Sequence, residues 1–284
     1  MKPALFDYVR ASSVEEAVAA LAASNGDAKV LAGGQSLVPM LNFRVVDAPL
    51  FVDINGIEGL DLIEEKEDGG LRIGALTRHF ALETSVSVRD RFPVLHEAMK
   101  HVAHLAIRNR GTIGGSLSHA DPAAELPMMA VLLDAKIVAA GPDGEREIPA
   151  GDFFTAPLTT VLAPDEIVVA VDLPGLPAVT GWGFEEFAQR RGDFAVAGVA
   201  ALVTREGGTV TNTRIALMGL HDTPVRARSA EAAFGESGIE AAAVAARQDA
   251  DPMNDLHGSA DYRRHLAEAL TRRVLTAALE RAAQ

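Results

Sequence analysis

Apolar and polar positions follow two different periods along the first sixty residues. Behind a serine pair at 12–13, apolar residues recur at helical spacing at Val14, Val18 and Leu21. Early glutamates follow the serines, and this pattern is typical of a capped amphipathic helix. Short apolar runs at 29–32 and 50–55 predict two strands, with a short helix at 37–42 between them.

The same mixture of strands and helices continues through the middle of the chain. Strand-like apolar runs cover 71–76, 136–140 and 166–174. Thr77 is expected to cap a helix over 78–85, and Pro93 to open a second helix that reaches Leu105. Val94, Ala98, Val102 and Leu105 would share one face of this second helix. A further helix is expected over 123–135.

A Pro- and Gly-rich segment at 174–179 is the best candidate for a domain boundary. Beyond it, residues 195–220 predict a β-hairpin, whose turn contains Gly207 and Gly208 and has no further role. The remainder is Ala-rich and ends in an amphipathic helix over 262–283. Its arginines are expected to form a solvated face with salt bridges: Arg263, Arg264, Arg272 and Arg273.

The amino-acid composition narrows the range of functions that the protein can have. With 26 Lys and Arg against 39 Asp and Glu, the formal net charge of −13 disfavours nucleic acid or an anionic membrane as partner. The chain has no cysteine, so disulfides, thiolate-bound iron–sulfur clusters and Cys-ligated zinc are excluded from it. The longest apolar run, 195–203, is too short to span a bilayer, and the N-terminus has no signal-peptide pattern. These features predict a cytoplasmic protein without membrane insertion.

Two short Gly-Gly-polar segments, GGQSL at 33–37 and GGSLS at 114–118, carry the candidate chemistry. Backbone N–H groups of a glycine-rich turn can hold a phosphate without lysine, and a helix N-terminus adds its dipole. Two such loops suit a pyrophosphate. Hydroxyl donors and local positive charge are available nearby, from Ser36, Thr112, Ser116, Arg108 and Arg110.

Polar and acidic residues follow the second loop within a few positions, at His119, Asp121 and Glu125. Carboxylates beside a phosphate site can accept hydrogen bonds from sugar hydroxyls, which suggests a nucleotide cofactor. Each glycine pair could also be a simple turn. His119 and Asp121 could bind a metal but lack a third spaced ligand. His101 and His104 are expected on a half-exposed helix face, and no Ser-His-Asp arrangement is present.

Three segments together resemble the FAD-binding medium subunit of the molybdenum hydroxylases: AGGQSL (32–37), IRNRGTIGGSLSHADPAAELP (107–127) and QRRGDFAVAGVA (189–200). This family includes carbon monoxide dehydrogenase, xanthine dehydrogenase and bacterial nicotine- or nicotinate-type dehydrogenases. The resemblance implies an α+β fold. A two-subdomain FAD-binding domain of the vanillyl-alcohol-oxidase type (1–176, with subdomains 1–57 and 58–176) would precede a smaller α/β domain (177–284) with an antiparallel sheet and helices.

The resemblance also implies the FAD contacts. Glu125 would bind the sugar-alcohol chain, Ile167 would pack near the flavin, and Arg190 would lie near the isoalloxazine ring. The full implied set is Ala32, Gly33, Gly34, Gln35, Ser36, Leu37, Val102, Thr112, Gly114, Gly115, Ser116, Asp121, Glu125, Ile167 and Arg190. Neither a catalytic residue nor a metal ligand is expected. Gln35, Ser116 and Glu125 depart from the residues common in the family but keep their hydrogen-bonding ability.

By the same resemblance, the chain would carry electrons and leave substrate oxidation to partners. A large subunit would hold the molybdenum–pterin cofactor and a small one two [2Fe–2S] clusters, assembled as a dimer of heterotrimers. The organic substrate, the electron acceptor (NAD, a quinone or oxygen) and the residue that gates it stay open. Two alternatives are a self-sufficient FAD-dependent reductase of the same fold and a non-enzymatic nucleotide-binding subunit.

Overall fold

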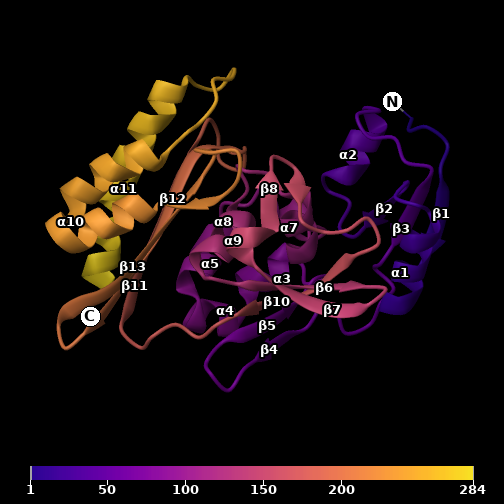
Figure 1. The fold of residues 1–284 in the computed structure, drawn as a ribbon, viewed down its shortest axis with the longest axis horizontal. Helices are drawn as coiled ribbons and strands as arrows, with labels where there is room; N and C mark the ends of the chain where they lie inside the picture. Colours follow the sequence, from indigo (N-terminus) through magenta and orange to yellow (C-terminus); the bar gives the residue numbers. More distant parts are fainter. Residues whose placement is uncertain (1, 284) are drawn as a thin grey trace.

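The computed structural model describes residues 2–283, which form three bodies that follow one another along the chain (Figure 1). The first contains a parallel sheet of strand order β1-β3-β2, formed by β1 (Asp7–Arg10), β2 (Ala28–Leu31) and β3 (Leu50–Asp53). Helix α1 (Val14–Ala23) joins β1 to β2, and α2 (Leu37–Asn42) lies between β2 and β3. Ser13 caps α1 by accepting a hydrogen bond from the Glu16 N–H, so the predicted helix start is confirmed.

The second body is a five-stranded antiparallel sheet with helices packed against it. Its strand order is β4-β5-β10-β6-β7. The strands are β4 (Ile63–Glu65), β5 (Leu71–Gly74), β6 (Lys136–Gly141), β7 (Gly144–Pro149) and β10 (Ile167–Leu173). A short ribbon, β8 (Phe154–Ala156) with β9 (Thr159–Thr160), adjoins them. The helices are α3 (His79–Thr84), α4 (Val86–Arg91), α5 (Pro93–Met99), α6 (Leu105–Arg108), α7 (Ile113–His119), α8 (Glu125–Leu132) and α9 (Ala150–Phe153).

Strand β10 is buried along its whole length because both of its faces are covered. Ile167 and Val169 pack in a core shared with α1 and the parallel sheet, whereas Val168 and Val171 join the core under the helices of the second body. Coverage of both faces explains why this strand appears in the sequence as an uninterrupted apolar run.

The third body is a four-stranded antiparallel sheet with two long helices on its outer face (Figure 1). Its elements are β11 (Thr180–Ala188), β12 (Ala195–Glu206), β13 (Thr209–Met218), β14 (Val225–Arg226), α10 (Arg228–Asp249) and α11 (Ala260–Arg281). Along β12, Val199 and Val203 pack toward α10 and α11, and Ala200 and Leu202 pack into the core of the second body. The sheet therefore contributes side chains to two cores, one on each face. The predicted hairpin turn lies between β12 and β13.

Two helix predictions are wrong. The helix that begins at Pro93 ends at Met99 rather than at Leu105. Arg108 donates hydrogen bonds to the carbonyls of Val102 and Ala103, and Ala103 takes a left-handed φ of 42°. This short-range contact accompanies the end of a helix that periodicity alone would continue, so His101 lies in a turn and His104 just before α6, rather than on one helix face.

Thr77 does not cap a helix, because its side chain is buried and its carbonyl accepts a hydrogen bond from the Ile113 N–H. Helix α3 instead begins after Arg78. In addition, the Gly-rich second loop is itself the first turn of helix α7, which composition did not indicate because glycine disfavours a helix interior.

The expectation for the C-terminal arginines is correct for three and wrong for one. Arg264, Arg272 and Arg273 form surface ion pairs. Arg263 is buried and donates to the carbonyls of Val196 and Gly219 and to the Asp255 carboxylate. It therefore fastens the start of α11 to the ends of β12 and β13.

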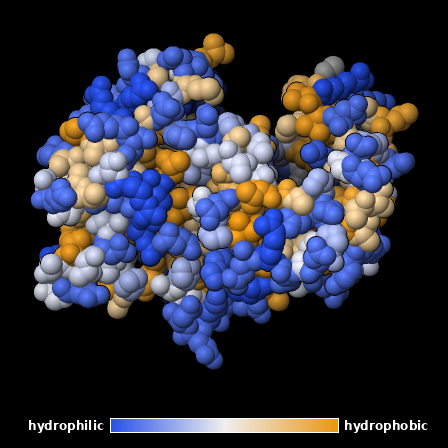
Figure 2. All heavy atoms as spheres, viewed as in Figure 1, coloured by the Kyte–Doolittle hydropathy of each residue, from blue (hydrophilic) through white to orange (hydrophobic). Residues whose placement is uncertain are grey.

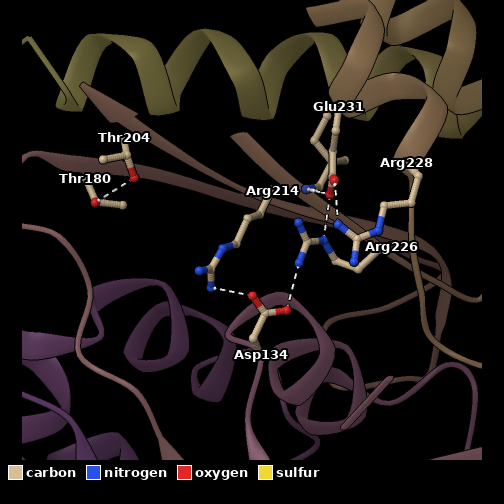
Figure 3. Close-up of polar contacts among 8 residues, drawn as sticks. Asp134, Thr180, Thr204, Arg214, Arg226, Arg228 and Glu231 are labelled. Carbon is tan, nitrogen blue, oxygen red and sulfur yellow. Dashed lines mark hydrogen bonds and ion pairs between the residues drawn. The ribbon is translucent and has the colours of Figure 1, made fainter. Parts of the chain in front are cut away.

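A polar clamp joins the third body to the second (Figure 3). Asp134, just after α8, lies 3.0 Å from Arg214 and 2.9 Å from Arg226 through its two carboxylate oxygens. Glu231 of α10 holds Arg226 from the other side at 2.6 Å and also accepts the Ile215 N–H. Two arginines of one body thus converge on a single carboxylate of the other.

Replacing Arg263 with methionine should lower the free energy of unfolding by about 3 kcal/mol. The change removes the donors of two carbonyls and one carboxylate while keeping the apolar stem. Urea denaturation followed by circular dichroism measures the loss. Arg264→Met is the matched control, and we expect it to change stability by less than about 1 kcal/mol because its ion pairs are exposed. Equal losses in both variants would contradict the role given to Arg263.

Candidate functional site

The two Gly-Gly segments, distant in sequence, lie against each other. A Cβ atom placed on Gly33 would lie 2.4 Å from the Arg110 carbonyl oxygen and 2.9 Å from the Gly111 Cα. A Cβ on Gly115 would lie 3.9 Å from the Ala32 Cβ. The carboxyl end of β2 therefore meets the start of α7, and only glycine at position 33 permits this approach.

The first loop offers a run of unused backbone donors. Within residues 2–283, no acceptor is hydrogen-bonded to the N–H groups of Gly33, Gly34, Gln35, Ser36 or Leu37. Gly34 has a φ of 72°, and Gln35 donates its side-chain amide to the Gly33 carbonyl, which holds the turn. Successive free N–H groups in such a turn form a concave site suited to an anion.

The second loop contributes in a different way from the one predicted. The first N–H groups of α7 are already bonded within the protein: Ile113 to Thr77, Gly114 to Ala75, and Gly115 to the Thr112 hydroxyl. Toward the first loop it presents Gly115, which has no side chain to fill the space between the loops. The Ser116 hydroxyl has no hydrogen-bond partner among the described residues.

Asn55 and Arg78 tie the two loops together. The side-chain amide of Asn55 donates to the Ala32 carbonyl at 2.8 Å. Arg78 donates to the Asn55 side-chain oxygen at 2.7 Å and to the Arg110 carbonyl at 2.5 Å. One guanidinium therefore connects the end of β3, the first loop and the approach to the second.

His79 fixes the second loop from inside the protein. Its backbone N–H donates to the Gly111 carbonyl, and its Nε2 lies 3.0 Å from the Thr112 carbonyl. Burial, with a smaller contribution from Arg108 and Arg78, lowers the pKa of His79 to about 4. The ring is thus neutral at physiological pH, and Nε2 carries the proton that it donates to Thr112.

A second polar group lies near the boundary between the second and third bodies. Burial first, and then the charges of Glu186 and Asp121, raise the pKa of Glu125 to about 8, although part of the residue remains exposed. Glu186 of β11 has a side chain only 6% exposed, and its Oε1 lies 3.3 Å from Nδ1 of His101. Glu125 is therefore protonated at neutral pH and can donate a hydrogen bond.

The other predicted contacts are spread around these two groups. Val102 is buried, and Asp121 accepts the Ala123 N–H. Arg190 is exposed on the loop between β11 and β12, where Gly192 packs on the turn at 103–104. Ile167 lies in the core between the first two bodies, away from the surface. The structure brings the two loops together, and the assignment of each residue to a flavin contact stays a prediction.

The sequence analysis did not single out Asn55, Arg78 and His79, which hold the two loops together, or Glu186, and it placed His101 on a helix face outside the site. A signal existed for Asn55, because it follows a strand next to the strand that ends at the first loop, and the carboxyl ends of parallel strands share one edge. The others act through contacts between distant segments, which local pattern does not reveal.

The surface is hollowed between the N-terminal body and the rest of the molecule (Figure 2). Within residues 2–283, no group of three or more metal-ligating side chains is close enough to hold a metal ion. In the same range, no helix is both long and apolar enough to cross a membrane.

Comparison with known proteins agrees with this geometry. A family described as the FAD binding domain in molybdopterin dehydrogenase matches residues 4–176, and the CO dehydrogenase flavoprotein C-terminal domain matches residues 182–278. These matches define a flavoprotein component of an oxidoreductase. The chain belongs to the FAD-binding medium subunits of the molybdenum hydroxylases.

Relatives match along almost the whole chain. The 6-hydroxypseudooxynicotine dehydrogenase complex subunit alpha of Paenarthrobacter nicotinovorans is 46% identical, covering 99% of this chain and 97% of that one. The carbon monoxide dehydrogenase medium chain of Hydrogenophaga pseudoflava is 38% identical over the full length of both. A solved carbon monoxide dehydrogenase from Hydrogenophaga pseudoflava has a TM-score of 0.96 at 40% identity, covering 99% of each chain. Quinoline 2-oxidoreductase from Pseudomonas putida 86 gives 0.94 at 38%, covering both chains fully.

Acid should destabilise the protein through His79. Its folded-state pKa lies below the unfolded value of 6.5, so the stability that its neutral ring contributes is complete above pH 6.5. That contribution is lost as pH falls toward 4, by on the order of 3 kcal/mol. Denaturant titrations between pH 7 and 4 should show a shallower decline in His79→Gln, which can still donate to Thr112. His119→Gln should retain the wild-type decline, and an unchanged slope in His79→Gln would contradict the assignment.

Proposed function

We propose that this chain binds the pyrophosphate of FAD between the loops 32–37 and 112–116. The observation that carries the proposal is the row of five unused N–H groups on the first loop, beside Gly115 in the first turn of α7. Neutral donors suit a phosphate in a protein of net charge −13, because they need no buried lysine.

The remaining contacts follow from the same placement. Ser36 and Ser116 offer hydroxyls that no described residue uses, and protonated Glu125 can donate to a hydroxyl of the sugar-alcohol chain. Val102, Asp121, Ile167 and Arg190 complete the proposed set. We also propose residues 1–176 as the FAD-binding domain, with subdomains 1–57 and 58–176, and residues 177–284 as the domain that covers the flavin.

FAD would give this chain its redox chemistry, since it exchanges electrons singly or in pairs. We propose that electrons arrive from [2Fe–2S] clusters of a small partner subunit and leave to an external acceptor. A large partner with the molybdenum cofactor would oxidise the organic substrate, in a cytoplasmic dimer of heterotrimers. The absence of cysteine supports this division, because no thiolate-bound cluster can form on this chain.

Gly34→Val should abolish FAD binding or weaken it at least ~100-fold. Gly34 has a φ of 72°, which valine resists, and a Cβ there would lie 3.1 Å from Val38. Gly207→Val is the matched control, since its φ is 56° and the space around it is open. Titration of the purified chain with FAD, followed by quenching of flavin fluorescence, measures both. Equal loss in the two variants would mean that backbone strain, and not the binding loop, had been tested.

The isolated, FAD-loaded chain should bleach when mixed with a chemically reduced [2Fe–2S] protein from a molybdenum hydroxylase. It should not oxidise an aldehyde or a heteroaromatic compound by itself, because we assign substrate activation to the molybdenum cofactor of the large partner. Anaerobic absorbance of the flavin measures the first expectation, and product analysis measures the second. Substrate turnover by the isolated chain would overturn the electron-transfer role, and a chain that refuses FAD would overturn the whole proposal.

A further inference from the structure

Arg78 is fixed to the second loop through its backbone. Backbone hydrogen bonds on either side of it, and a β-bridge between Arg78 and Thr112, hold the segment 77–79 antiparallel to the segment 111–113. The main chain at this position therefore moves only together with the start of α7. The side chain of Arg78 forms its hydrogen bonds outside this segment, with Asn55 and with the Arg110 carbonyl.

Asn55 is fixed to the first loop through its side chain. Its backbone N–H and its Nδ2 both donate to Oδ1 of Asp53, at 2.8 Å and 2.6 Å, and the Tyr8 hydroxyl holds the other oxygen of Asp53. Nδ2 also donates to the Ala32 carbonyl, at the start of the first loop, at 2.8 Å. A reversed amide would point its oxygen at a carbonyl and a carboxylate, so only one orientation of the Asn55 side chain is favourable.

This orientation presents Oδ1 of Asn55 as an acceptor to the guanidinium of Arg78. Nη2 of Arg78 donates to it at 2.7 Å, and Nη1 donates to the Arg110 carbonyl at 2.5 Å. The oxygen of that carbonyl is the atom closest to a Cβ placed on Gly33. One guanidinium thus holds both the support of the first loop and the backbone atom against which that loop packs.

The apolar core shared by the first two bodies contains no residue of the segments 33–37 and 111–116, so it joins the bodies without fixing how the loops face each other. The bonds of Asn55 and Arg78 join protein groups to one another and need no ligand. We propose that these two side chains act as one positioning unit, which holds the two loops at a fixed separation before FAD arrives. This inference rests on the proposed function. A site formed in advance loses less conformational freedom on binding and therefore binds more tightly.

The separation of the loops can be measured without FAD, because the chain has no cysteine of its own to compete for labels. Spin labels on the exposed positions Phe43→Cys, at the end of α2, and Asn109→Cys, before the second loop, report it by double electron–electron resonance. The labelled chain should show one narrow distance that FAD leaves unchanged. Adding Arg78→Met should broaden the distribution, and FAD should narrow it again. A narrow distribution in Arg78→Met, or a distance that FAD changes when Arg78 is present, would overturn the inference.

FAD titration of the full chain tests what the positioning unit contributes to binding. When only about a tenth of the molecules have the binding-competent arrangement, the apparent Kd rises ~tenfold. We expect this rise in Arg78→Met and in Asn55→Leu, and little more in the double variant, because both side chains act through one hydrogen bond. In stopped-flow quenching of flavin fluorescence, the rate should level off with FAD concentration in these variants and stay linear in the wild type. Additive losses, or an unchanged Kd in Arg78→Met, would contradict a single unit.

Arg91→Met is the matched control, because Arg91 of α4 also donates to a carbonyl and to a side chain, those of Gly69 and Glu65. It should bind FAD as the wild type does, and equal losses in Arg91→Met and Arg78→Met would reduce the effect to general destabilisation. Arg78→Lys keeps the charge and should give an intermediate Kd, which tests the inference even where the methionine variant folds poorly. A wild type that refuses FAD would count against the proposed function, and the spin-label distances would still decide whether Arg78 fixes the loops.

Discussion

The close approach of Gly33 to the Arg110–Gly111 backbone is the constraint on which the rest of the site depends. No side chain fits there, since a Cβ would lie 2.4 Å from a carbonyl oxygen. The parallel sheet must therefore meet the five-stranded body at the end of β2, and α7 must begin at the same point. Asn55 and Arg78 then bond across the contact. The candidate site, which is formed by two bodies, has a fixed geometry because the contact is between backbone atoms. Changes of side-chain rotamer cannot loosen such a contact.

At the proposed FAD site, positive groups hold the two loops together, and the groups proposed to recognise the ligand are neutral. Arg78 is directed at a carbonyl and an amide, and His79 is held neutral by burial. The positive electrostatic potential at the first loop comes from oriented N–H dipoles. No charged side chain therefore has to be desolvated there. This is how, in our proposal, an acidic chain binds a dianionic pyrophosphate despite the repulsion from its net negative charge.

Local pattern predicted the elements that depend on local causes. Ser13 as a cap, the buried run of β10, the hairpin at Gly207 and the short α2 all follow from a few neighbouring residues. The errors come from side-chain contacts with backbone carbonyls, which the spacing of apolar residues does not reveal. Arg108 ends α5 early, and Arg263 is buried because two strand ends present carbonyls to it. For the site, the paired glycines identified the loops, but the side chains that bind them together are scattered along the chain and leave no periodic signal.

The third body completes the core of the second, because β12 packs on both faces and makes its sheet part of the core beneath α5 and α8. Asp134 reinforces that union through Arg214 and Arg226. A boundary this firmly closed can keep Glu186 desolvated, which a mobile interface would hydrate. The two-faced sheet thus gives a physical reason for the full-length match to relatives, since the second body alone would expose the part of its core that β12 and β13 cover.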